Sequence, residues 1–253
     1  MPTPPEIAPG APVWLDLQSS DTDRSIEFYT GVFGWTHERA GAEFNDYVNF
    51  SKNGHRVAGM VANQPGMPDF WTVYLKTEDA EATAAAIAEN GGQVFFRHEV
   101  PGLGTMVGLA DPSGAQLGAW QPSGHPGFGL VNEAGAPVWH ELHATDYDGA
   151  LAFYRDAFGW TTTSMSDTAD FRMSTFSAGG DPLAGIFDAS GYLEAGQTAR
   201  WMPYFGVEDT DATASVVVSL GGTQLDPVTD SPFGRMTHLA DPTGALLTII
   251  QVL

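Results

Sequence analysis

Apolar and polar residues alternate along this chain with two different periods. Residues 13–18 alternate with period two, and the next stretch places Ile26, Tyr29 and Phe33 at helical spacing before Gly34. Period two puts alternate side chains on opposite faces of a strand, whereas a period near 3.6 gives a helix one apolar face. The pattern therefore predicts a strand followed by a helix that ends at the glycine.

The same scheme continues through the chain. Asp21 precedes the first predicted helix, where acidic residues cap helix N-termini. In the first half, the other predicted elements are strands at 47–50, 57–61 and 71–75, a helix at 80–89, and strands at 93–96, 105–109 and 115–120. In the second half, they are a strand at 138–143, a helix at 148–158, strands at 173–176, 183–187 and 201–207, a helix at 212–220, and closing strands. We expect an α+β fold in which each half contains two paired βαβββ units.

The two halves of the chain repeat one another. The segment 10–17, Gly-Ala-Pro-Val-Trp-Leu-Asp-Leu, returns at 135–142 as Gly-Ala-Pro-Val-Trp-His-Glu-Leu, and 109–115 returns at 239–245. Because both blocks keep their order and nearly their spacing, they indicate duplication of a whole domain. Each copy, at about 120 residues, is long enough to bury its own core.

A segment rich in glycine and proline, without periodicity, separates the two copies and is typical of a linker. We therefore expect a first domain over residues 1–122, a linker over 123–135 and a second domain over 136–253. In each domain we expect the helices to cover one face of a curved mixed sheet and the other face to form a cleft.

Composition narrows the classes of partner. A formal net charge of −21 repels nucleic-acid backbones and anionic lipids, so we expect neither as a partner. The absence of cysteine excludes disulfides, thiolate catalysis and cysteine-ligated zinc. No apolar run is long enough to span a membrane and the N-terminus lacks a secretory signal, which predicts a cytoplasmic protein. The duplication predicts a monomer in which the two copies pack together as an internal pseudo-dimer. As a partner we expect a small-molecule ligand.

Two motifs carry a resemblance to a known family. In the first copy, Phe28-Tyr29 and Phe33-Gly34-Trp35 close the first helix and an Asp-Pro-x-Gly sequence precedes the last strand; both motifs recur in the second copy. This arrangement resembles the glyoxalase/bleomycin resistance/dioxygenase superfamily, whose fold is called vicinal oxygen chelate. The tandem form is similar to actinobacterial proteins often labelled hydroxylases or glyoxalase-like. The resemblance covers nearly the whole chain.

The resemblance implies positions at which metal ligands would lie. Metal-dependent members place a histidine or glutamine early in the first strand of a unit and a glutamate in the last strand. The corresponding positions of this chain hold Trp14, Thr72, Trp139, Met202, Gly118 and Thr248. None of these is a histidine, glutamate or glutamine. We therefore expect no cofactor, and the alternative is a divalent metal at a non-standard position near His143.

The first strand of the first copy presents one face to the predicted cleft. If alternate leucines pack under the helix, then Trp14, Asp16 and Gln18 face the cleft, and Tyr74 lies on the matching face of the second unit. An aromatic wall beside a carboxyl group suits a flat apolar ligand. We interpret these residues as ligand-binding. The alternative is a structural role for the matched residues of the two copies, Asp16 and Glu141, and Trp14 and Trp139.

The second copy carries an additional histidine on the same face. The matching register directs Trp139, Glu141 and His143 into the cleft, with Tyr204 opposite, and His238 as a further candidate. A carboxylate and an imidazole two residues apart on one strand can act together as an acid–base pair. We therefore predict Glu141, His143 and Tyr204 as catalytic residues, and Trp139 and His238 as ligand-binding residues.

The remaining histidines are predicted to be structural or solvated. His140 alternates onto the apolar side of its strand and is expected to be a core histidine with its hydrogen bonds satisfied. The other histidines fall in predicted loops or strand edges and are expected to be solvated: His37, His55, His98 and His125.

Three functions are compatible with these residues. The first is a small-molecule-binding protein whose aromatic-lined cleft takes an apolar or aromatic ligand without a metal. The second is a lyase, isomerase or oxygenase-type enzyme that acts on a small carbonyl or aromatic compound through Glu141 and His143. The third is an interaction protein whose clefts are vestigial.

Overall fold

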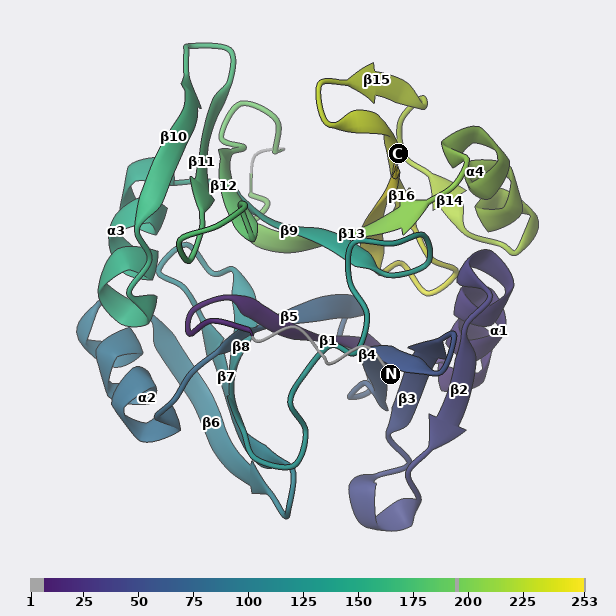
Figure 1. Ribbon diagram of the computed structural model, residues 1–253, viewed down its shortest axis with the longest axis horizontal. Helices are drawn as coiled ribbons and strands as arrows, with labels where there is room; N and C mark the ends of the chain where they lie inside the picture. Colours follow the sequence, from purple (N-terminus) through teal and green to yellow (C-terminus); the bar gives the residue numbers. More distant parts are fainter. Residues whose placement is uncertain (1–6, 194–195, 253) are drawn as a thin grey trace.

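Two curved sheets, one for each copy of the repeat, make up most of the protein (Figure 1). The computed structural model describes residues 7–193 and 196–252. The helices within these residues are α1 Thr22–Phe33, α2 Ala80–Glu89, α3 Tyr147–Phe158 and α4 Thr210–Ser219, with the short 3₁₀ helix η1 Ala42–Phe44.

The sheet of the first copy has the strand order β2-β3-β4-β1-β5-β8-β7-β6. Its strands are β1 Pro12–Ser19, β2 Thr36–Arg39, β3 Val48–Lys52, β4 His55–Ala62, β5 Phe70–Lys76, β6 Gln93–Val100, β7 Gly104–Ala110 and β8 Gln116–Pro122. β1 pairs antiparallel with β5, which joins the two units into one sheet.

The sheet of the second copy has the equivalent order β10-β11-β12-β9-β13-β17-β16-β14, and β15 also pairs with β16. Its strands are β9 Pro137–Ala144, β10 Thr162–Asp167, β11 Arg172–Phe176, β12 Ala184–Asp188, β13 Arg200–Val207, β14 Thr223–Gln224, β15 Thr229–Ser231, β16 Gly234–Ala240 and β17 Leu246–Gln251. Antiparallel pairing of β9 with β13 joins its two units.

This architecture confirms the predicted α+β fold with two tandem copies of paired βαβββ units. The sequence pattern did not predict β2 or β10. β2 is exposed throughout and β10 is mostly exposed. Because an edge strand without a buried face has no apolar alternation, periodicity could not reveal either one.

The boundaries of the first helix in each copy follow from the repeated sequence. Asp21 caps α1 by accepting a hydrogen bond from the Arg24 backbone N–H. Gly34 ends the helix in the left-handed conformation, with φ of 64°. Asp146 and Gly159 do the same for α3. The predicted cap and stop signals therefore fix where each of these helices begins and ends.

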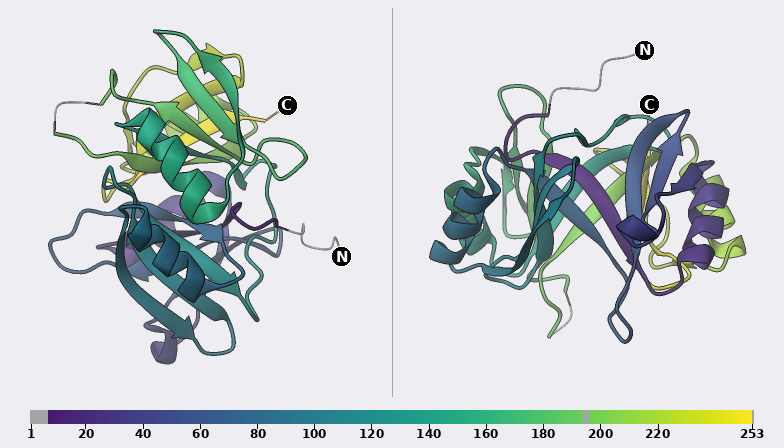
Figure 2. Two further views of the ribbon diagram at one scale, coloured as in Figure 1. Left: turned by 90° about the vertical axis from the view of Figure 1, so that its left-hand side faces the viewer. Right: turned by 90° about the horizontal axis from the view of Figure 1, so that it is seen from below.

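The concave faces of the two sheets point in opposite directions. In Figure 1 the second copy opens at the top and the first copy opens at the bottom. α1 packs against α4 on one side of the molecule and α2 packs against α3 on the other, and Figure 2 shows these pairs outside the sheets. The convex faces meet each other around β5 and β13, and we call this contact the seam.

Aromatic residues fill the seam. The Phe205 ring lies 5.4 Å from the Trp71 ring, centroid to centroid. Two tryptophans also donate hydrogen bonds across it: Trp35 Nε1 to the Gly135 carbonyl at 2.7 Å, and Trp160 Nε1 to the Gly10 carbonyl at 2.8 Å. Because the donors and acceptors are repeated residues, the seam has an approximate twofold symmetry.

The segment between β8 and β9 packs against the first copy. Phe128 is 2% exposed, and its backbone N–H donates to the Val13 carbonyl. The prediction that His125 is solvated is wrong: it is buried, its ring lies 4.4 Å from that of Trp14, and burial lowers its pKa to about 4. The sequence pattern missed this contact because it is made by a loop.

Within the described residues, no helix has both the length and the apolar character needed to cross a bilayer.

Candidate functional site

Glu141 lies on the concave face of the second copy, at the centre of a group of polar side chains. The His143 Nε2 lies 3.1 Å from Glu141 Oε1, and the Tyr204 hydroxyl donates to the same oxygen at 2.9 Å. Trp139 Nε1 donates to the other oxygen at 3.1 Å. Glu141, His143 and Tyr204 are all buried. These residues form an ordered group at the floor of the concave face.

Strand geometry explains why these side chains meet. Trp139, Glu141 and His143 alternate along β9, so they share a face. Tyr204 lies on β13 directly opposite Trp139 in the antiparallel register. The sequence prediction placed these residues on one face, and the structure brings them together there.

The surroundings of Glu141 keep it ionised. Burial raises the pKa of this carboxyl group, but the hydrogen bond and charge of His143 and the hydrogen bonds from Trp139 and Tyr204 outweigh it, so the pKa lies below its usual range. Burial and the neighbouring Glu141 charge raise the pKa of Tyr204 well above 10. Tyr204 is therefore a neutral donor, and Glu141 is a buried carboxylate.

A second carboxylate–imidazole pair faces the first one. His238 Nδ1 lies 2.6 Å from Asp226 Oδ2, and the His238 backbone N–H also donates to Asp226. The rings of His143 and His238 are 6.3 Å apart, centroid to centroid. Both members of this second pair are half-buried. Sequence reasoning found His238 but missed Asp226, which lies between predicted elements and is twelve residues from its partner.

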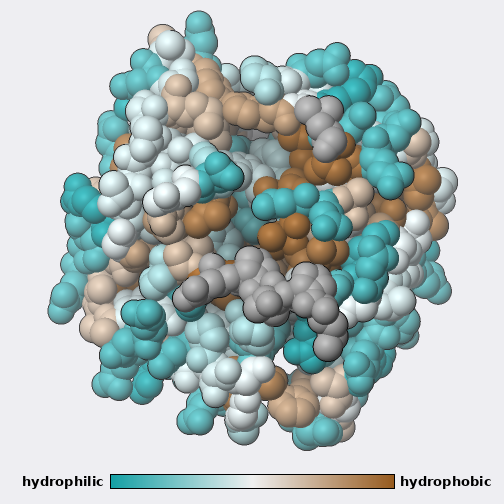
Figure 3. Space-filling model, viewed as in Figure 1, coloured by the Kyte–Doolittle hydropathy of each residue, from teal (hydrophilic) through white to brown (hydrophobic). Residues whose placement is uncertain are grey.

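Aromatic residues form a rim beside His143. Phe187 contacts His143 at 5.7 Å between ring centroids, and Phe171 and Tyr192 lie 5.7 Å and 5.3 Å from Phe187. Tyr192 is 67% exposed. Figure 3 shows a recess in the upper half of this view, bordered by apolar residues. Exposure increases from the buried His143 through the half-buried Phe187 to the exposed Tyr192.

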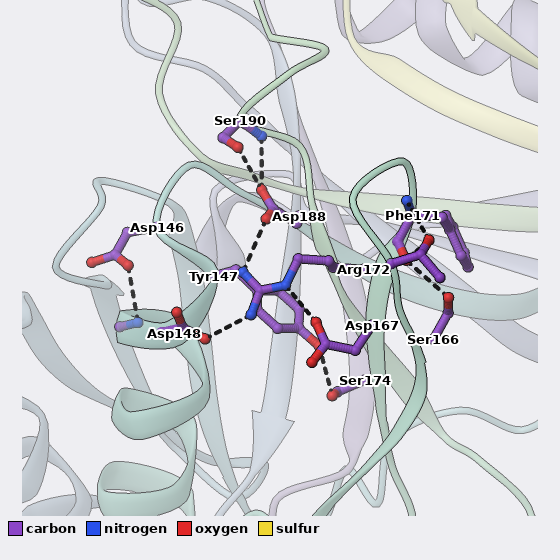
Figure 4. Close-up of polar contacts among 12 residues, drawn as sticks. Asp146, Tyr147, Asp148, Ser166, Asp167, Phe171, Arg172, Ser174, Asp188 and Ser190 are labelled. Atoms are coloured by element: carbon purple, nitrogen blue, oxygen red, sulfur yellow. Dashed lines mark hydrogen bonds and ion pairs between the residues drawn. The ribbon is translucent and has the colours of Figure 1, made fainter.

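Arg172 holds the strands that carry this rim (Figure 4). Its guanidinium bonds Asp167, Asp148 and Asp188 and lies 4.4 Å above the Tyr147 ring. These partners belong to β10, α3 and β12, and Arg172 itself begins β11. The arginine therefore ties β11, which Phe171 directly precedes, to β12, on which Phe187 lies.

The equivalent position of the first copy is filled by its own side chains. Asp16 Oδ1 accepts hydrogen bonds from Trp14 Nε1 at 2.9 Å and from the Tyr47 hydroxyl. The Tyr47 ring lies against Gly59, where a Cβ would be 1.7 Å from the tyrosine oxygen. Burial raises the pKa of Asp16 to about 6, although hydrogen bonds from Tyr47, Trp14 and Tyr74 oppose the increase.

The other predicted ligand-binding residues of the first copy follow the same face. Trp14 and Tyr74 are paired across β1 and β5, and both are buried. Gln18 is half-buried near the end of β1, one alternation beyond Asp16. The structure therefore groups Trp14, Asp16 and Tyr74, and adds Tyr47, which begins the predicted strand 47–50 but was not among the predicted site residues.

His140 departs from its sequence interpretation in one respect. It is buried on the side of β9 away from the concave face, as expected. Its Nε2, however, has no hydrogen-bond partner. The expectation of a satisfied core histidine is therefore wrong.

The side chains on the two concave faces do not fit a divalent metal ion. Across residues 7–193 and 196–252, no three or more histidine, aspartate or glutamate side chains are arranged to hold one. The positions implied by the family resemblance hold aromatic, apolar, glycine or threonine residues, which are poor ligands for such an ion. Glu141 and His143 supply two donors, and Glu141 already accepts from its neighbours.

Comparisons with known proteins support the family resemblance. The family described as "Glyoxalase/Bleomycin resistance protein/Dioxygenase superfamily" matches residues 11–118 and 138–249. CFP32 of Mycobacterium tuberculosis is 34% identical, over 99% of this chain and 98% of its own. The anthracycline biosynthesis protein DauV of Streptomyces sp. (strain C5) is 36% identical, over 97% of this chain and 94% of its own.

A solved structure shows the same fold. The Mn(II)-bound glyoxalase from Novosphingobium aromaticivorans aligns with a TM-score of 0.66 and 16% identity, covering 97% of this chain and 83% of that protein. At this identity the likeness extends to the fold alone.

Proposed function

Because the chain belongs to the Glyoxalase/Bleomycin resistance protein/Dioxygenase superfamily, we propose that its second copy binds an uncharged small molecule with an aromatic body. The ligand lies on the concave face, between the Phe187 rim and the polar group around Glu141. The first copy does not bind it, because Tyr47 occupies the equivalent place.

The contrast between the two copies carries this proposal. In the first copy the buried carboxyl group is closed off by Trp14 and Tyr47. In the second copy the equivalent of Tyr47 is Met173, which packs at Gly185 and makes no such bond to Glu141. Glu141 itself is as buried as Asp16, at 8% and 7% exposed, but the residues around it include the half-buried His238 and the exposed Tyr192, from which a ligand would approach.

Charge and a relative indicate the class of ligand. The net charge of −21 and the carboxylates of Glu141 and Asp226 disfavour an anion. Phe171, Phe187 and Tyr192 offer ring faces and edges for stacking. DauV is named for anthracycline biosynthesis, which supports a fused-ring aromatic ligand for this chain as well.

Calorimetric titration with 1,8-dihydroxyanthraquinone tests the proposal. We expect saturable binding with one molecule per chain, and Phe187→Ala to weaken it about tenfold through loss of ring contact. The matched control is Val61→Ala, because Val61 pairs with Gln18 in the first copy as Phe187 pairs with His143 in the second. Absence of binding to this probe, or equal loss in both variants, contradicts the proposal and favours vestigial clefts.

A second candidate is an enzyme that acts on the bound molecule. The observation that favours it is the His143–Glu141 contact of 3.1 Å facing the His238–Asp226 pair. A carboxylate beside an imidazole can accept a proton next to a carbonyl and return it elsewhere, as a lyase or isomerase requires. Tyr204 would donate a hydrogen bond to the developing oxyanion once displaced from Glu141.

His143→Gln separates binding from catalysis, because glutamine is the residue that the first copy has at the equivalent position, Gln18. Mass spectrometry of recovered ligand would detect conversion by the wild type. For an enzyme, we expect the variant to bind within about twofold and convert at least a hundredfold more slowly. Unchanged ligand from the wild type favours the binding protein. Metal content of both proteins, purified without chelators, tests the alternative of a metal near His143.

A further inference from the structure

All three residues in one row of the concave face differ between the two copies. In the second copy, this row pairs across neighbouring strands Phe187 on β12, His143 on β9 and Arg200 on β13. In the first copy, the same register holds Val61, Gln18 and Phe70. By contrast, the polar group beside this row has a tryptophan, an acidic residue and a tyrosine in both copies. Because residues that pair directly across strands project from the same face, Arg200 lies beside His143 on the concave face.

Arg200 is a half-buried cation without a partner. Across residues 7–193 and 196–252, its side chain makes no hydrogen bond and no ion pair. Six other arginines each pair with a carboxylate: Arg24, Arg39, Arg97, Arg155, Arg172 and Arg235. With 31 acidic residues against 10 basic ones, the chain has no shortage of carboxylates. Burial lowers the pKa of Arg200 from its usual 12.5, but a guanidinium stays charged at neutral pH.

The two terminal nitrogens of Arg200 are the donors that a ligand can reach. Nε is the one nitrogen of this guanidinium that is both buried and without a partner, so the terminal nitrogens, which also lack partners in the described residues, are accessible. A guanidinium only donates hydrogen bonds, so its ligand must be an acceptor. The carboxylates of Glu141 and Asp226 nearby disfavour an anionic acceptor. A carbonyl oxygen is an uncharged group that accepts without donating.

We propose that Arg200 binds a carbonyl oxygen of the ligand on the concave face. This inference rests on the proposed function, and it narrows the ligand from uncharged aromatic molecules to aromatic ketones and quinones. Phe187 and Arg200 lie on either side of His143, on the two strands that flank β9. Their backbones are therefore about 10 Å apart, twice the spacing of neighbouring strands. A fused-ring molecule that contacts Phe187 extends over His143 and presents its far edge to Arg200.

Binding of 9-fluorenone and of fluorene to the full chain tests this subsite. The two probes share one ring system and differ in a carbonyl group that replaces a methylene. Loss of a hydrogen bond from a charged donor weakens binding about tenfold. We expect Arg200→Met to weaken 9-fluorenone about tenfold and to change fluorene less than twofold. Phe187→Ala should weaken both probes alike, because both use the ring contact on the concave face.

Arg56→Met is the matched control for the loss of one positive charge. Arg56 is an exposed arginine of the first copy, so this variant should leave the affinity for both probes unchanged. The infrared carbonyl stretch of bound 9-fluorenone reports the contact directly: a hydrogen bond lowers its frequency, so the frequency should be lower in wild type than in Arg200→Met. Thermal unfolding shows that the variants are folded.

The outcomes separate this inference from the proposed function. Equal affinity of wild type for the two probes, an unchanged carbonyl frequency in Arg200→Met, or an equal loss of 9-fluorenone affinity in Arg56→Met overturns the role of Arg200 alone. Binding of 1,8-dihydroxyanthraquinone without binding of 9-fluorenone does the same. If wild type binds none of the three aromatic probes, both the inference and the proposed function fail.

Discussion

Asp16 and Glu141 occupy the same position in the two copies, yet their surroundings shift them in opposite directions. Burial raises the pKa of Asp16 to about 6, and its neighbours Trp14 and Tyr47 are neutral donors. Glu141 is equally buried, but His143 beside it helps to lower its pKa. The imidazole of His143, which the first copy lacks, therefore accounts for much of the difference. Asp16 is a carboxyl group suited to a closed core, and Glu141 is a carboxylate suited to a ligand site.

The free energy of unfolding of Asp16→Asn should increase relative to that of wild type as the pH rises. The ordinary pKa of this group is 3.8 and the folded value is about 6, so the folded state binds more protons between these values. Wild-type stability is therefore lost as the pH rises from about 4 to 6, and the neutral asparagine avoids this loss. We expect the free energy of unfolding of the variant, relative to wild type, to increase by about 2 kcal/mol across that window.

Urea denaturation at pH 4, 6 and 8 measures this change. Glu141→Gln is the matched control with the opposite sign: because the folded pKa of Glu141 is lowered, wild type gains stability over that variant as the pH rises. Parallel pH profiles for Asp16→Asn and wild type would disprove the explanation.

β11 and its neighbours depend on Arg172 for their relative positions. The arginine bonds acidic residues of β10, α3 and β12. Phe171 directly precedes the arginine in the chain, and Phe187 directly precedes its partner Asp188. The side chain is partly exposed, so each ion pair contributes little to stability on its own. Its effect on the rim is geometric, because three elements share one cation.

Arg172→Met should weaken ligand binding more than it weakens the fold. We expect about a threefold loss of 1,8-dihydroxyanthraquinone affinity and a stability change of about 1 kcal/mol or less. Arg39→Met is the matched control: it removes the ion pair to Asp23, the first-copy equivalent of Asp148. Calorimetric titration of both variants measures this loss of affinity. An equal loss in Arg39→Met would show that the effect is not local to the rim.

The repeated motifs meet across the seam of the whole molecule. The Tyr29 hydroxyl of the first copy donates to Asp241 at 2.9 Å, and the Tyr154 hydroxyl of the second donates to Asp111 at 3.4 Å. Each aspartate belongs to the Asp-Pro-x-Gly turn of the other copy. The two motifs that carried the family resemblance are therefore the groups that bind the copies together.

Tyr29→Phe should destabilise the protein more than Tyr154→Phe. Both substitutions leave a buried carboxylate and a buried tryptophan N–H with one partner fewer, but the bond made by Tyr29 to aspartate is shorter. We expect losses of about 2 kcal/mol and about 1 kcal/mol in the free energy of unfolding. Thermal or urea unfolding measures both, and a larger loss for Tyr154→Phe would show that distance does not rank these contacts.

Much of this architecture follows from patterns that are local in the chain. Period-two alternation placed Glu141 and His143 on one face of a strand, and the repeated blocks established the duplication. Alternation depends on neighbours a few residues apart, and the duplication on comparing two stretches of sequence, so both can be read without knowing the fold. The caps at Asp21 and Asp146 belong to the same group.

Other features depend on which distant residues come into contact, and only the tertiary structure decided them. Tyr47 closes the first copy from 31 residues away along the chain, and Asp226 reaches His238 from a loop. A linker residue, Phe128, packs on the ring of His140, whose Nε2 has no hydrogen-bond partner. Alternation assigns a side chain to a face of its strand, but contacts with residues distant in the chain determine whether that face is filled or open.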